Sequence, residues 1–287
     1  MSEETYRTSE TDPLAPLLGR GSLTASVFFS GTLCGSSVHP AEESTGIVHL
    51  VRRGPVRILG GQVQTRQIDL PSLVFVPRPL PHRLETEGSA GADLVCARLT
   101  FDSAASGLLL LGFPDCLVIP LADLEGLEPV LTRLFAEAFS DDFGRRLAVD
   151  LLVELLMVLL LRHCLAQGQV QQGVLAGLAD PQLSRVLRAV NAAPEETFSI
   201  ERLAAIAGMS RSSFAAAFKA RVGVAPGDYL TLLRLAQAKR LLLAGRPLKA
   251  IASVVGYGSP TALARAFQRH EGLGPRAWLA RQKVQED

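Results

Sequence analysis

The sequence predicts an α+β protein in three parts: an N-terminal antiparallel β-barrel over residues 12–120, a helical segment over residues 121–178, and an all-α C-terminal domain over residues 179–287. Three observations predict this organisation. Short β-like runs broken by Gly or Pro fill the first part, a helical apolar period fills the second, and a pair of helices is repeated in the third. A chain of 287 residues is long enough for more than one core.

The N-terminal part has the pattern of short strands between Leu23 and Phe101. Its runs are rich in Val, Ile, Leu and Phe, and no helical period lies between them. Several short strands without intervening helices favour an antiparallel barrel or sandwich. Gly60 and Gly61 tolerate the positive φ of a two-residue hairpin, so we expect a tight turn over Leu59–Gln62.

The helical segment is predicted to contain two helices. The first carries an apolar stripe of Leu127, Val130, Leu131, Leu134 and Phe135. The second, about Arg145–Gln167, is apolar almost all round, apart from a narrow polar face of Arg146, Asp150 and Glu154. Such a helix is buried either against a helix of its own chain or at a subunit interface. The width of its apolar surface favours the interface, and we therefore expect a homodimer.

The C-terminal part contains the same helix pair twice. Leu203–Pro226 aligns with Ile251–Pro275 when Gly208 is placed on Gly256, with one additional residue in the second turn. The coinciding pairs are Leu203 with Ile251, Ile206 with Val254, Phe214 with Leu263, Phe218 with Phe267, Gly223 with Gly272 and Pro226 with Pro275. Glycine accepts a left-handed helix exit, and Ser210 and Ser259 are suited to cap the following helix. Each copy therefore predicts a helix-turn-helix motif.

The second helix of each copy leaves one face outward, small near its start and basic further on. Such a face suits insertion into the major groove of DNA. The candidate DNA-contacting residues are Arg211, Ser212, Ser213, Ala215, Ala216 and Lys219 in the first copy, and Ser259, Pro260, Thr261, Ala264, Arg265, Gln268 and Arg269 in the second. A connecting helix over Gly227–Gly245 would hold the two reading helices about 34 Å apart, one turn of B-DNA.

Charge is divided unequally between the two halves of the chain. The whole chain has a net charge of +1, but residues from Asp180 onward contain 16 basic and 8 acidic side chains, a net charge of +8. The preceding residues contain 13 basic and 20 acidic side chains, a net charge of −7. The asymmetry favours a polyanion as partner of the C-terminal part. Double-stranded DNA is the predicted partner.

The last hundred or so residues resemble the DNA-binding domain of the AraC/XylS family of transcriptional regulators. The resemblance rests on "IERLAAIAGMSRSSFAAAFK", "RLAQAKRLLL" and "GYGSPTALARAFQRHEGLGPRAWL". It implies that the second helix of each unit contacts bases, and that RNA polymerase is a further partner if the protein is an activator, as we expect. Family members often place larger groups where this chain has Ser212, Ala215 and Ala216. We therefore expect the first unit to position the protein on phosphates, and Arg265, beside Thr261, to contact a base.

The N-terminal part resembles the cupin-type sensor half of one branch of that family, in "GIVHLVRRGPVRI" and "LPSLVFVPRPLPHRL". Pro77 and His82 fall at the intervals of the second cupin motif, whereas Pro71 and Pro79 replace its glycines. The first motif's paired histidines and glutamate are missing around His49. A full ligand set for oxygenase chemistry is therefore absent, and we predict no enzyme. The alternative function is a metal-dependent cupin enzyme fused to a helical domain.

Cys34 and Cys96 resemble the positions of two cysteines in the hypochlorite-responsive regulators of this branch. The resemblance implies an oxidisable pair that senses an oxidant. In a second reading, Cys34, His49, His82 and Cys96 bind zinc or copper(I), ions that suit nitrogen and sulfur ligands. A third reading is a small organic effector in the barrel, and a fourth is two buried structural cysteines. Either sensing version requires Cys34 and Cys96 to lie close together.

Cellular location is predicted from the absence of two signals. The polar, acidic N-terminus has no signal-peptide pattern, and the run Leu147–Leu161 is too short and too acidic to span a bilayer comfortably. We therefore expect a cytoplasmic protein without a membrane partner. Its cysteines should stay reduced, with Cys116 and Cys164 structural.

Overall fold

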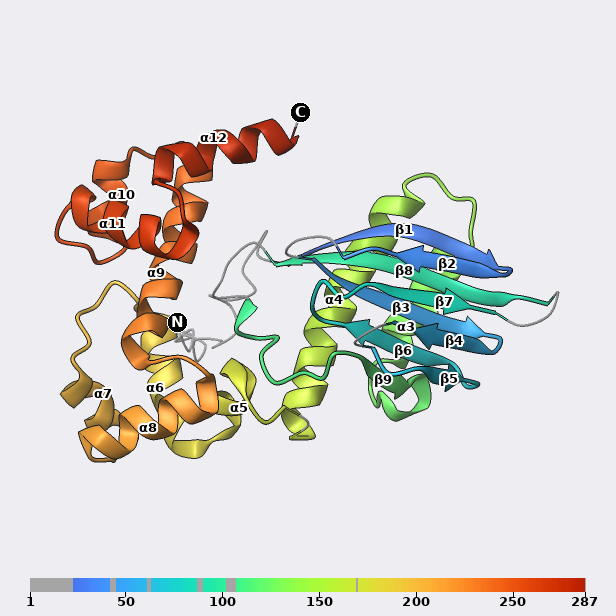
Figure 1. Cartoon of the computed structure of the whole chain (residues 1–287), viewed down its shortest axis with the longest axis horizontal. Coiled ribbons are helices and arrows are strands. Elements are labelled where there is room, and N and C mark those ends of the chain that lie inside the picture. The colour runs from blue at the N-terminus through green and yellow to red at the C-terminus, as the bar shows by residue number, and fades with distance from the viewer. Residues whose placement is uncertain are drawn as a thin grey trace, which may run out of the picture. The chain divides into compact units, whose positions relative to one another are not determined.

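A computed structural model describes residues 23–41, 45–60, 63–86, 90–101, 107–168 and 170–286 (Figure 1). The chain divides into two compact units. One unit, here called the barrel unit, contains residues 20–102 and 110–176. The other, here called the DNA-binding unit because the predicted helix-turn-helix repeat lies in it, contains the described residues 107–109 and 177–286.

The barrel unit is built from two antiparallel sheets. The strands are β1 (Leu23–Leu33), β2 (Ser36–His39), β3 (Thr45–Arg53), β4 (Val56–Leu59), β5 (Arg66–Ile68), β6 (Ser72–Val76), β7 (His82–Glu85), β8 (Ala92–Phe101) and β9 (Leu117–Pro120). The larger sheet has the order β1-β8-β3-β6-β9 and the smaller sheet β2-β7-β4-β5. Apolar side chains from both sheets, such as Val74 and Leu94 from one and Ile58 and Leu84 from the other, meet in one core. The predicted antiparallel β-domain is confirmed.

The predicted hairpin over Leu59–Gln62 falls partly outside the described residues, because Gly61 and Gln62 are not described. The strands on either side are described, and they pair with Ile58 opposite Arg66. The connection is therefore longer than the two residues predicted. The two glycines alone did not reveal where the second strand begins.

The barrel unit also contains α3 (Glu128–Ala138) and α4 (Arg145–Ala166), preceded by a short 3-10 helix η1 (Leu121–Asp123). The acidic residues of α4 have a structural role. The Asp150 carboxylate accepts a hydrogen bond from the backbone N–H of Val27 at 2.7 Å, and the Glu154 carboxylate accepts one from Ala25 at 3.1 Å. Both N–H groups belong to β1, the edge strand of the larger sheet. Edge strands present unpaired backbone donors, and these two carboxylates satisfy them.

One side of α4 is buried and another is exposed. Val153, Leu156 and Leu160 are fully buried. Leu147, Leu151 and Leu155 lie four residues apart on another side and are 66%, 55% and 46% exposed. The apolar pattern of this helix therefore has two parts, and packing within the chain accounts for only one of them.

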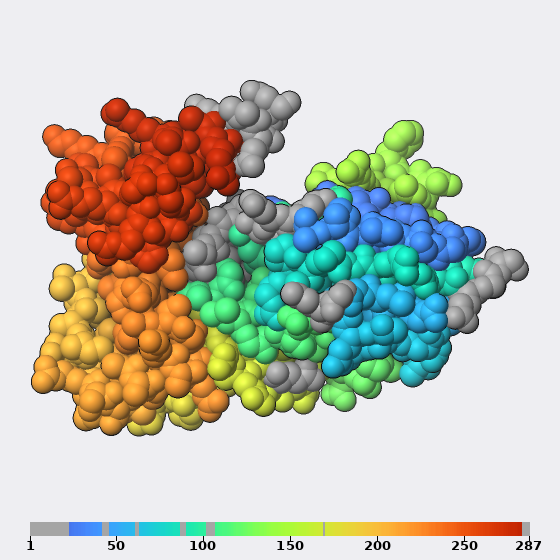
Figure 2. Space-filling view, viewed as in Figure 1, coloured from blue at the N-terminus to red at the C-terminus, as the bar shows by residue number. Residues whose placement is uncertain are grey.

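The DNA-binding unit is helical. Its helices are α6 (Pro181–Ala192), α7 (Ile200–Ala207), α8 (Arg211–Val222), α9 (Pro226–Leu243), α10 (Leu248–Val254), α11 (Pro260–Glu271) and α12 (Pro275–Glu286), and α5 (Gly173–Ala179) precedes them. The predicted helix-turn-helix repeat is present as α7–α8 and α10–α11. Figure 2 shows the second pair in the red region of the surface and the first pair in the yellow and orange region, with the colours keyed to the labels of Figure 1.

Each helix-turn-helix has its own aromatic core. In the first, the ring of Phe218 packs between Phe214 and Tyr229, with centroid distances of 5.6 and 5.8 Å. In the second, Phe267 packs against Trp278 at 5.7 Å. Phe218 and Phe267 are the residues that the repeat aligns, so the alignment correctly identified both cores.

No helix in the described ranges is both long and apolar enough to cross a membrane.

Candidate nucleic-acid interface and barrel centre

Helix α8 begins where the sequence predicts. Gly208 ends α7 with a left-handed φ of 69°. The hydroxyl of Ser210 then caps α8 by accepting a hydrogen bond from the N–H of Ser213 at 3.2 Å. The tight turn exposes the start of α8 to solvent, and most of its predicted DNA-contacting residues are exposed. Those residues are Arg211, Ser212, Ser213, Ala216 and Lys219, and Ala215 is half-buried.

Arg211 is exposed but already has a partner. Its guanidinium donates to the Glu201 carboxylate of α7 at 2.8 Å. This hydrogen bond holds the pKa of Glu201 below its usual range. A DNA phosphate would have to compete with Glu201 for the same group. Lys219, in contrast, has no partner among the described residues.

Helix α11 is built in the same way and presents different side chains. The hydroxyl of Ser259 caps it through the N–H of Ala262 at 3.1 Å, and Pro260 occupies its first turn. Thr261, Arg265 and Arg269 are exposed. In the described part of the chain, the Arg265 guanidinium has no ion-pair or hydrogen-bond partner.

Three other predicted residues of α11 are less free to contact DNA. The Gln268 amide donates to the carbonyl oxygen of Gly272 at 2.6 Å, and so satisfies the end of its own helix. Pro260 and Ala264 are half-buried. Sequence analysis also passed over exposed cations outside the two second helices, at Arg246, Lys249 and Arg276. Lys249 and Arg276 occupy the first turns of α10 and α12, and a search for basic residues near helix starts would have found them.

The prediction that Cys34 and Cys96 lie close together is wrong. In the pairing of β1 with β8, Phe29 lies opposite Cys96, and Cys34 is five residues further along. At about 3.3 Å per residue, that separation is roughly 16 Å. The Sγ atom of Cys34 lies instead beside Gly91, 2.9 Å from the position a Cβ would take there. The two cysteines can neither form a disulfide nor share a metal ion in this fold.

Cys96 is also poorly suited to react with an oxidant. It is 2% exposed, and burial raises the pKa of its thiol well above the usual range. The thiolate is the reactive form of cysteine, so this buried thiol is held in its unreactive form. Cys34 is exposed, and both Cys116 and Cys164 are buried with the pKa of each thiol raised to about 11.

Three histidines meet inside the barrel unit, and we call them the histidine cluster: His39, His49 and His82. The ring of His39 lies 4.8 Å from that of His49 and 5.1 Å from that of His82, measured between centroids. His39 and His82 are cross-strand partners in the smaller sheet. His49 is the cross-strand partner of Cys96 in the larger sheet. Sequence analysis missed His39, which precedes Pro40 and stands outside both cupin-like stretches.

Hydrogen bonds determine where the protons sit in the histidine cluster. His82 Nδ1 lies 2.8 Å from the carbonyl oxygen of Leu80, which can only accept, so Nδ1 carries a proton. His82 Nε2 is then an acceptor, and His49 Nε2, 2.8 Å away, donates to it. His49 Nδ1 consequently holds a lone pair. It is buried without a hydrogen-bond partner among the described residues, as is His39 Nε2.

The three imidazoles are neutral near pH 7. Burial lowers the pKa of His39 to about 4, with smaller contributions from His82 and Arg98. Burial also lowers the pKa of His49 well below its usual range, and lowers that of His82 against the opposing hydrogen bond to Leu80. A low-dielectric interior disfavours a second or third positive charge beside the first. The cluster can therefore offer a ligand unshared electron pairs but no positive charge.

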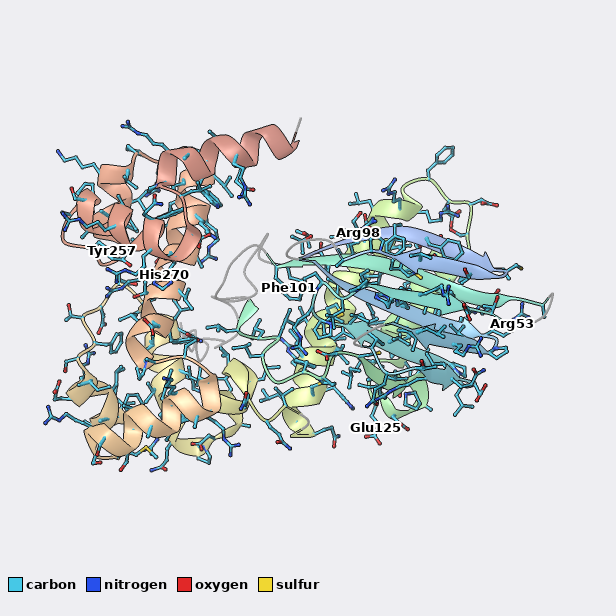
Figure 3. The ribbon with its side chains drawn as sticks, viewed as in Figure 1. Arg53, Arg98, Phe101, Glu125, Tyr257 and His270 are labelled. Carbon is cyan, nitrogen blue, oxygen red and sulfur yellow. The ribbon has the colours of Figure 1, made fainter. Side chains whose placement is uncertain are left out.

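The cluster adjoins a cavity of about 150 Å³ that His39 helps to line. Arg98 lies two residues beyond Cys96 on β8 and is labelled in Figure 3. Its guanidinium lies over the ring of Phe28 at 4.8 Å. The cavity is lined by Phe28, Ser37, Val38, His39, Pro40, Ile47 and Arg98. Its volume admits only a small ligand.

The resemblance to cupin domains raises the question of whether these residues can bind a metal ion. Three imidazole rings and the sulfur of Cys96 meet between the sheets, and two of the ring nitrogens have no hydrogen-bond partner among the described residues. However, among the described residues no three His, Cys, Asp or Glu side chains are arranged to hold an ion. His49 and His82 direct their Nε2 atoms at each other instead. The predicted set with Cys34 is therefore incorrect, and His39 lies where Cys34 was expected.

Two family models match the chain. A cupin family model matches residues 12–166, and a helix-turn-helix domain model matches residues 203–281. An HTH-type transcriptional regulator of Haemophilus influenzae is 29% identical over 80% of this chain and 84% of its own length. The HTH-type transcriptional regulator MtrA of Neisseria gonorrhoeae is 29% identical over 92% of this chain and 96% of its own. The RCS-specific activator RclR of Escherichia coli is 28% identical over 73% and 75%.

The chain aligns with these transcriptional regulators along most of their length. The comparisons therefore do not support the alternative of a cupin enzyme. The cupin match covers more than half of the chain, and the helix-turn-helix match covers both helix pairs. The chain belongs to the AraC family of DNA-binding helix-turn-helix transcriptional regulators, with an N-terminal cupin domain.

Proposed function

We propose that α8 and α11 enter successive major grooves of DNA and that α11 supplies most of the sequence preference. The observation that carries this proposal is the state of Arg265, which is exposed on the outer face of α11 without a partner in the described chain. An arginine in that state can donate two hydrogen bonds to the edge of a guanine. Thr261, one turn earlier, can contact a thymine methyl group.

The first helix-turn-helix is suited to positioning rather than to reading. The side chains of Ser212 and Ala216 are too short for a bidentate contact with a base. Arg211 is held by Glu201, and Lys219 lies near the end of α8. A lysine there can neutralise a phosphate, which strengthens binding to every sequence alike.

Two substitutions separate these roles. Arg265→Ala is expected to cost about 1–3 kcal/mol of binding free energy and to relax preference at one base position. Lys219→Ala is expected to weaken binding to all sequences alike and to flatten the salt dependence by about one unit. Both are measured by fluorescence anisotropy on duplexes that differ by single base pairs. If Arg265→Ala lowered affinity uniformly, Arg265 would be a phosphate contact and not a base reader.

We also propose that the protein is a homodimer through α4. Leu147, Leu151 and Leu155 form an exposed apolar stripe along one side of this helix. If two copies of the chain are related by a two-fold axis, the stripe of one copy can pack against the same stripe of the other. Burying leucines that are about half exposed stabilises a dimer by the hydrophobic effect.

Sedimentation tests the dimer. The wild-type protein is expected to sediment as a dimer at micromolar concentration, and Leu151→Glu as a monomer. Leu70 is a matched control because it is 63% exposed in a loop of the same unit. Leu70→Glu should remain dimeric. A monomeric wild-type protein, or a dimeric Leu151→Glu variant, contradicts the proposal.

The sensing centre is proposed to be the histidine cluster rather than a cysteine pair. Among the described residues, His49 Nδ1 and His39 Nε2 are buried without hydrogen-bond partners, and a small cavity adjoins His39. An unpartnered buried nitrogen costs free energy, which a ligand that forms a hydrogen bond with it recovers. At His49 Nδ1, which holds a lone pair, that ligand must supply a hydrogen-bond donor, as a small organic molecule can. A metal ion does not fit, because His49 and His82 direct their Nε2 atoms at each other.

Ligand binding is tested by thermal shift with a set of small organic hydrogen-bond donors. A ligand of the cluster is expected to raise the melting temperature of the wild-type protein and to act more weakly on His39→Ala. Cys34→Ser is the control and should respond as the wild type does. Equilibrium dialysis with zinc or copper(I) is expected to give no stoichiometric ion, because the described His, Cys, Asp and Glu side chains are not arranged to hold one. A thermal shift that His39→Ala leaves unchanged places the sensing centre elsewhere.

An activating role is supported by the name of one relative, since RclR of E. coli is called an activator. RNA polymerase is then the protein partner. Transcription in vitro from a promoter enriched by the protein should rise when the protein is added. A fall would indicate a repressor.

A further inference from the structure

The two helix-turn-helix pairs are joined by more than the connecting helix α9. Arg234, in the middle of α9, donates hydrogen bonds to the backbone of the segment that leads into the first pair. Its Nε atom lies 2.7 Å from the carbonyl oxygen of Pro194, and its Nη2 atom lies 2.9 Å from that of Glu196. A longer contact of 3.5 Å joins Nη2 to the carbonyl oxygen of Glu195. One guanidinium therefore holds three successive carbonyls.

The same guanidinium contacts the second pair. Its Cζ atom lies over the ring of Tyr257 at 5.6 Å. Tyr257 occupies the turn between α10 and α11 and is labelled in Figure 3. The turn of the second pair is therefore in contact with the middle of α9.

The segment and the turn also touch each other directly. Gly256 has a left-handed φ of 79°, and a Cβ atom there would clash with the carbonyl oxygen of Glu195 and lie 2.8 Å from its Cα. Both contacts are with backbone, which cannot move aside as a side chain can. Glycine is needed at this position for its φ and for this close approach.

We infer that Arg234, Tyr257, Gly256 and the segment Pro194–Glu196 form a junction that sets the distance and angle between α8 and α11. Arg234 is its positioning residue. The inference rests on the proposal that α8 and α11 are the two reading helices. Two reading heads that are held rigidly require their half-sites at one spacing, because each added base pair turns the second half-site by about 34°. A loosened junction tolerates other spacings and binds the native spacing more weakly, since less of the geometry is organised in advance.

The junction is tested with the full-length protein on duplex DNA enriched from a random library, with zero, one or two base pairs inserted between the half-sites of one protomer. For the wild type, two inserted base pairs should weaken binding about tenfold or more, because they turn the half-site by about 70°. For Arg234→Gln, native-spacing affinity should fall, and the penalty for the same insertion should shrink to about threefold or less. Arg234→Lys should give an intermediate penalty, because a single ammonium lacks the planar fork that donates from two separate nitrogens and lies over the Tyr257 ring.

The matched control is Arg202→Gln. Arg202 pairs with Glu196 at 2.7 Å and donates to the carbonyl of Thr197, so it holds the same segment from the side of α7. Its loss should leave the spacing penalty at the wild-type value. Tyr257→Leu removes the other side of the junction and should reduce the penalty as Arg234→Gln does. It serves as the second variant if Arg234→Gln does not fold.

Three outcomes overturn the inference. If the Arg234→Gln and Tyr257→Leu variants keep the wild-type spacing penalty, the junction does not set the geometry. If Arg234→Gln instead flattens the salt dependence by about one unit at every spacing, Arg234 is a phosphate contact. If inserted base pairs do not weaken binding of the wild type, the proposal that α8 and α11 both contact DNA fails, and the inference fails with it.

Discussion

The barrel unit and the DNA-binding unit differ in where their buried polar groups lack partners. In the DNA-binding unit, the Lys239 ammonium is paired with the Glu271 carboxylate at 2.6 Å, and the Tyr229 hydroxyl donates to the Asn191 side chain at 2.7 Å. Among the described residues of this unit, the buried side-chain oxygen Gln237 Oε1 has no hydrogen-bond partner. In the described part of the barrel unit, two histidine nitrogens of one cluster have no hydrogen-bond partner. Buried polar groups are normally satisfied, so a cluster of unmet ones marks a place that a ligand completes.

The exposed cations of both units include paired and unpaired ones. Arg53, Arg57 and Arg83 of the barrel unit are paired with carboxylates, as Arg211 is in the DNA-binding unit. On the two second helices, Arg265 and Lys219 are exposed without a partner among the described residues. The groups available to a ligand therefore lie inside the cupin domain, and those available to DNA lie on the outer faces of α8 and α11.

The largest effect is expected from breaking the paired interior of the DNA-binding unit. Lys239→Met leaves the Glu271 carboxylate largely buried without its partner and removes a cation that lies 5.3 Å from the Trp278 ring centroid. Loss of one member of a buried ion pair costs about 3–5 kcal/mol. We expect the free energy of unfolding of this unit to fall by that amount in urea titration. The double variant Lys239→Met with Glu271→Leu should recover much of the loss, and a single-variant cost below about 1 kcal/mol would show that the pair is weakly coupled.

A pH effect of about 2–3 kcal/mol is expected in the barrel unit. The folded pKa of His39 is about 4, against 6.5 for an ordinary histidine, and those of His49 and His82 are lowered as well. Below pH 6.5 the unfolded chain therefore takes up protons that the folded chain does not. The stability of this unit should be complete above pH 6.5 and fall between pH 6.5 and 4. Calorimetric scans across that range measure it, and His39→Leu should reduce the slope.

A smaller effect is expected from removing a histidine of the cluster. His39→Leu replaces a buried and unsatisfied nitrogen with carbon, and such exchanges are close to neutral or stabilising, within about 1 kcal/mol. The contrast with Lys239→Met is direct, because both positions are buried and polar. A loss above about 3 kcal/mol in urea at pH 7.5 would show that His39 has a structural partner and is not waiting for a ligand.

The smallest effect concerns Arg211, a cation of α8 that already pairs with a carboxylate. Glu201→Gln removes the carboxylate that holds Arg211. Release of Arg211 should raise affinity for DNA by a few-fold and steepen the salt dependence by up to about one unit. Anisotropy titrations between 50 and 200 mM salt, about the range over which such slopes are read, measure both. Unchanged affinity would show that Arg211 lies away from the phosphates.

The DNA-binding unit was predictable from sequence because its signals are local and repeated. Gly208 ends α7, Ser199, Ser210 and Ser259 cap the helices that follow them, and aligned apolar positions form both cores. Each of these features depends on residues a few positions apart, which sequence spacing describes directly. The Arg234 junction was not predictable in this way, because it joins residues about 40 positions apart along the chain.

The barrel centre was predicted less well for the same reason. Pairing between distant strands decides which residues meet, and neither the register nor the inward face can be read from a single strand. Cys96, His49 and His82 do line the interior. Cys34 was placed there by resemblance alone, but it lies past the end of β1. His39 lies on a four-residue strand, which is too short for its alternation to reveal an inward face.

The central claim is that DNA sequence is read by the second helix-turn-helix, while the first holds the protein on the backbone. A base-pair scan tests it directly. Every base pair of both half-sites is substituted in turn, and the dissociation constant of the wild-type protein is measured for each duplex. We expect at least one position under α11 to cost about 1–3 kcal/mol, and every position under α8 to cost no more than a few tenths. Equal costs under both helices, or larger costs under α8, would contradict the claim.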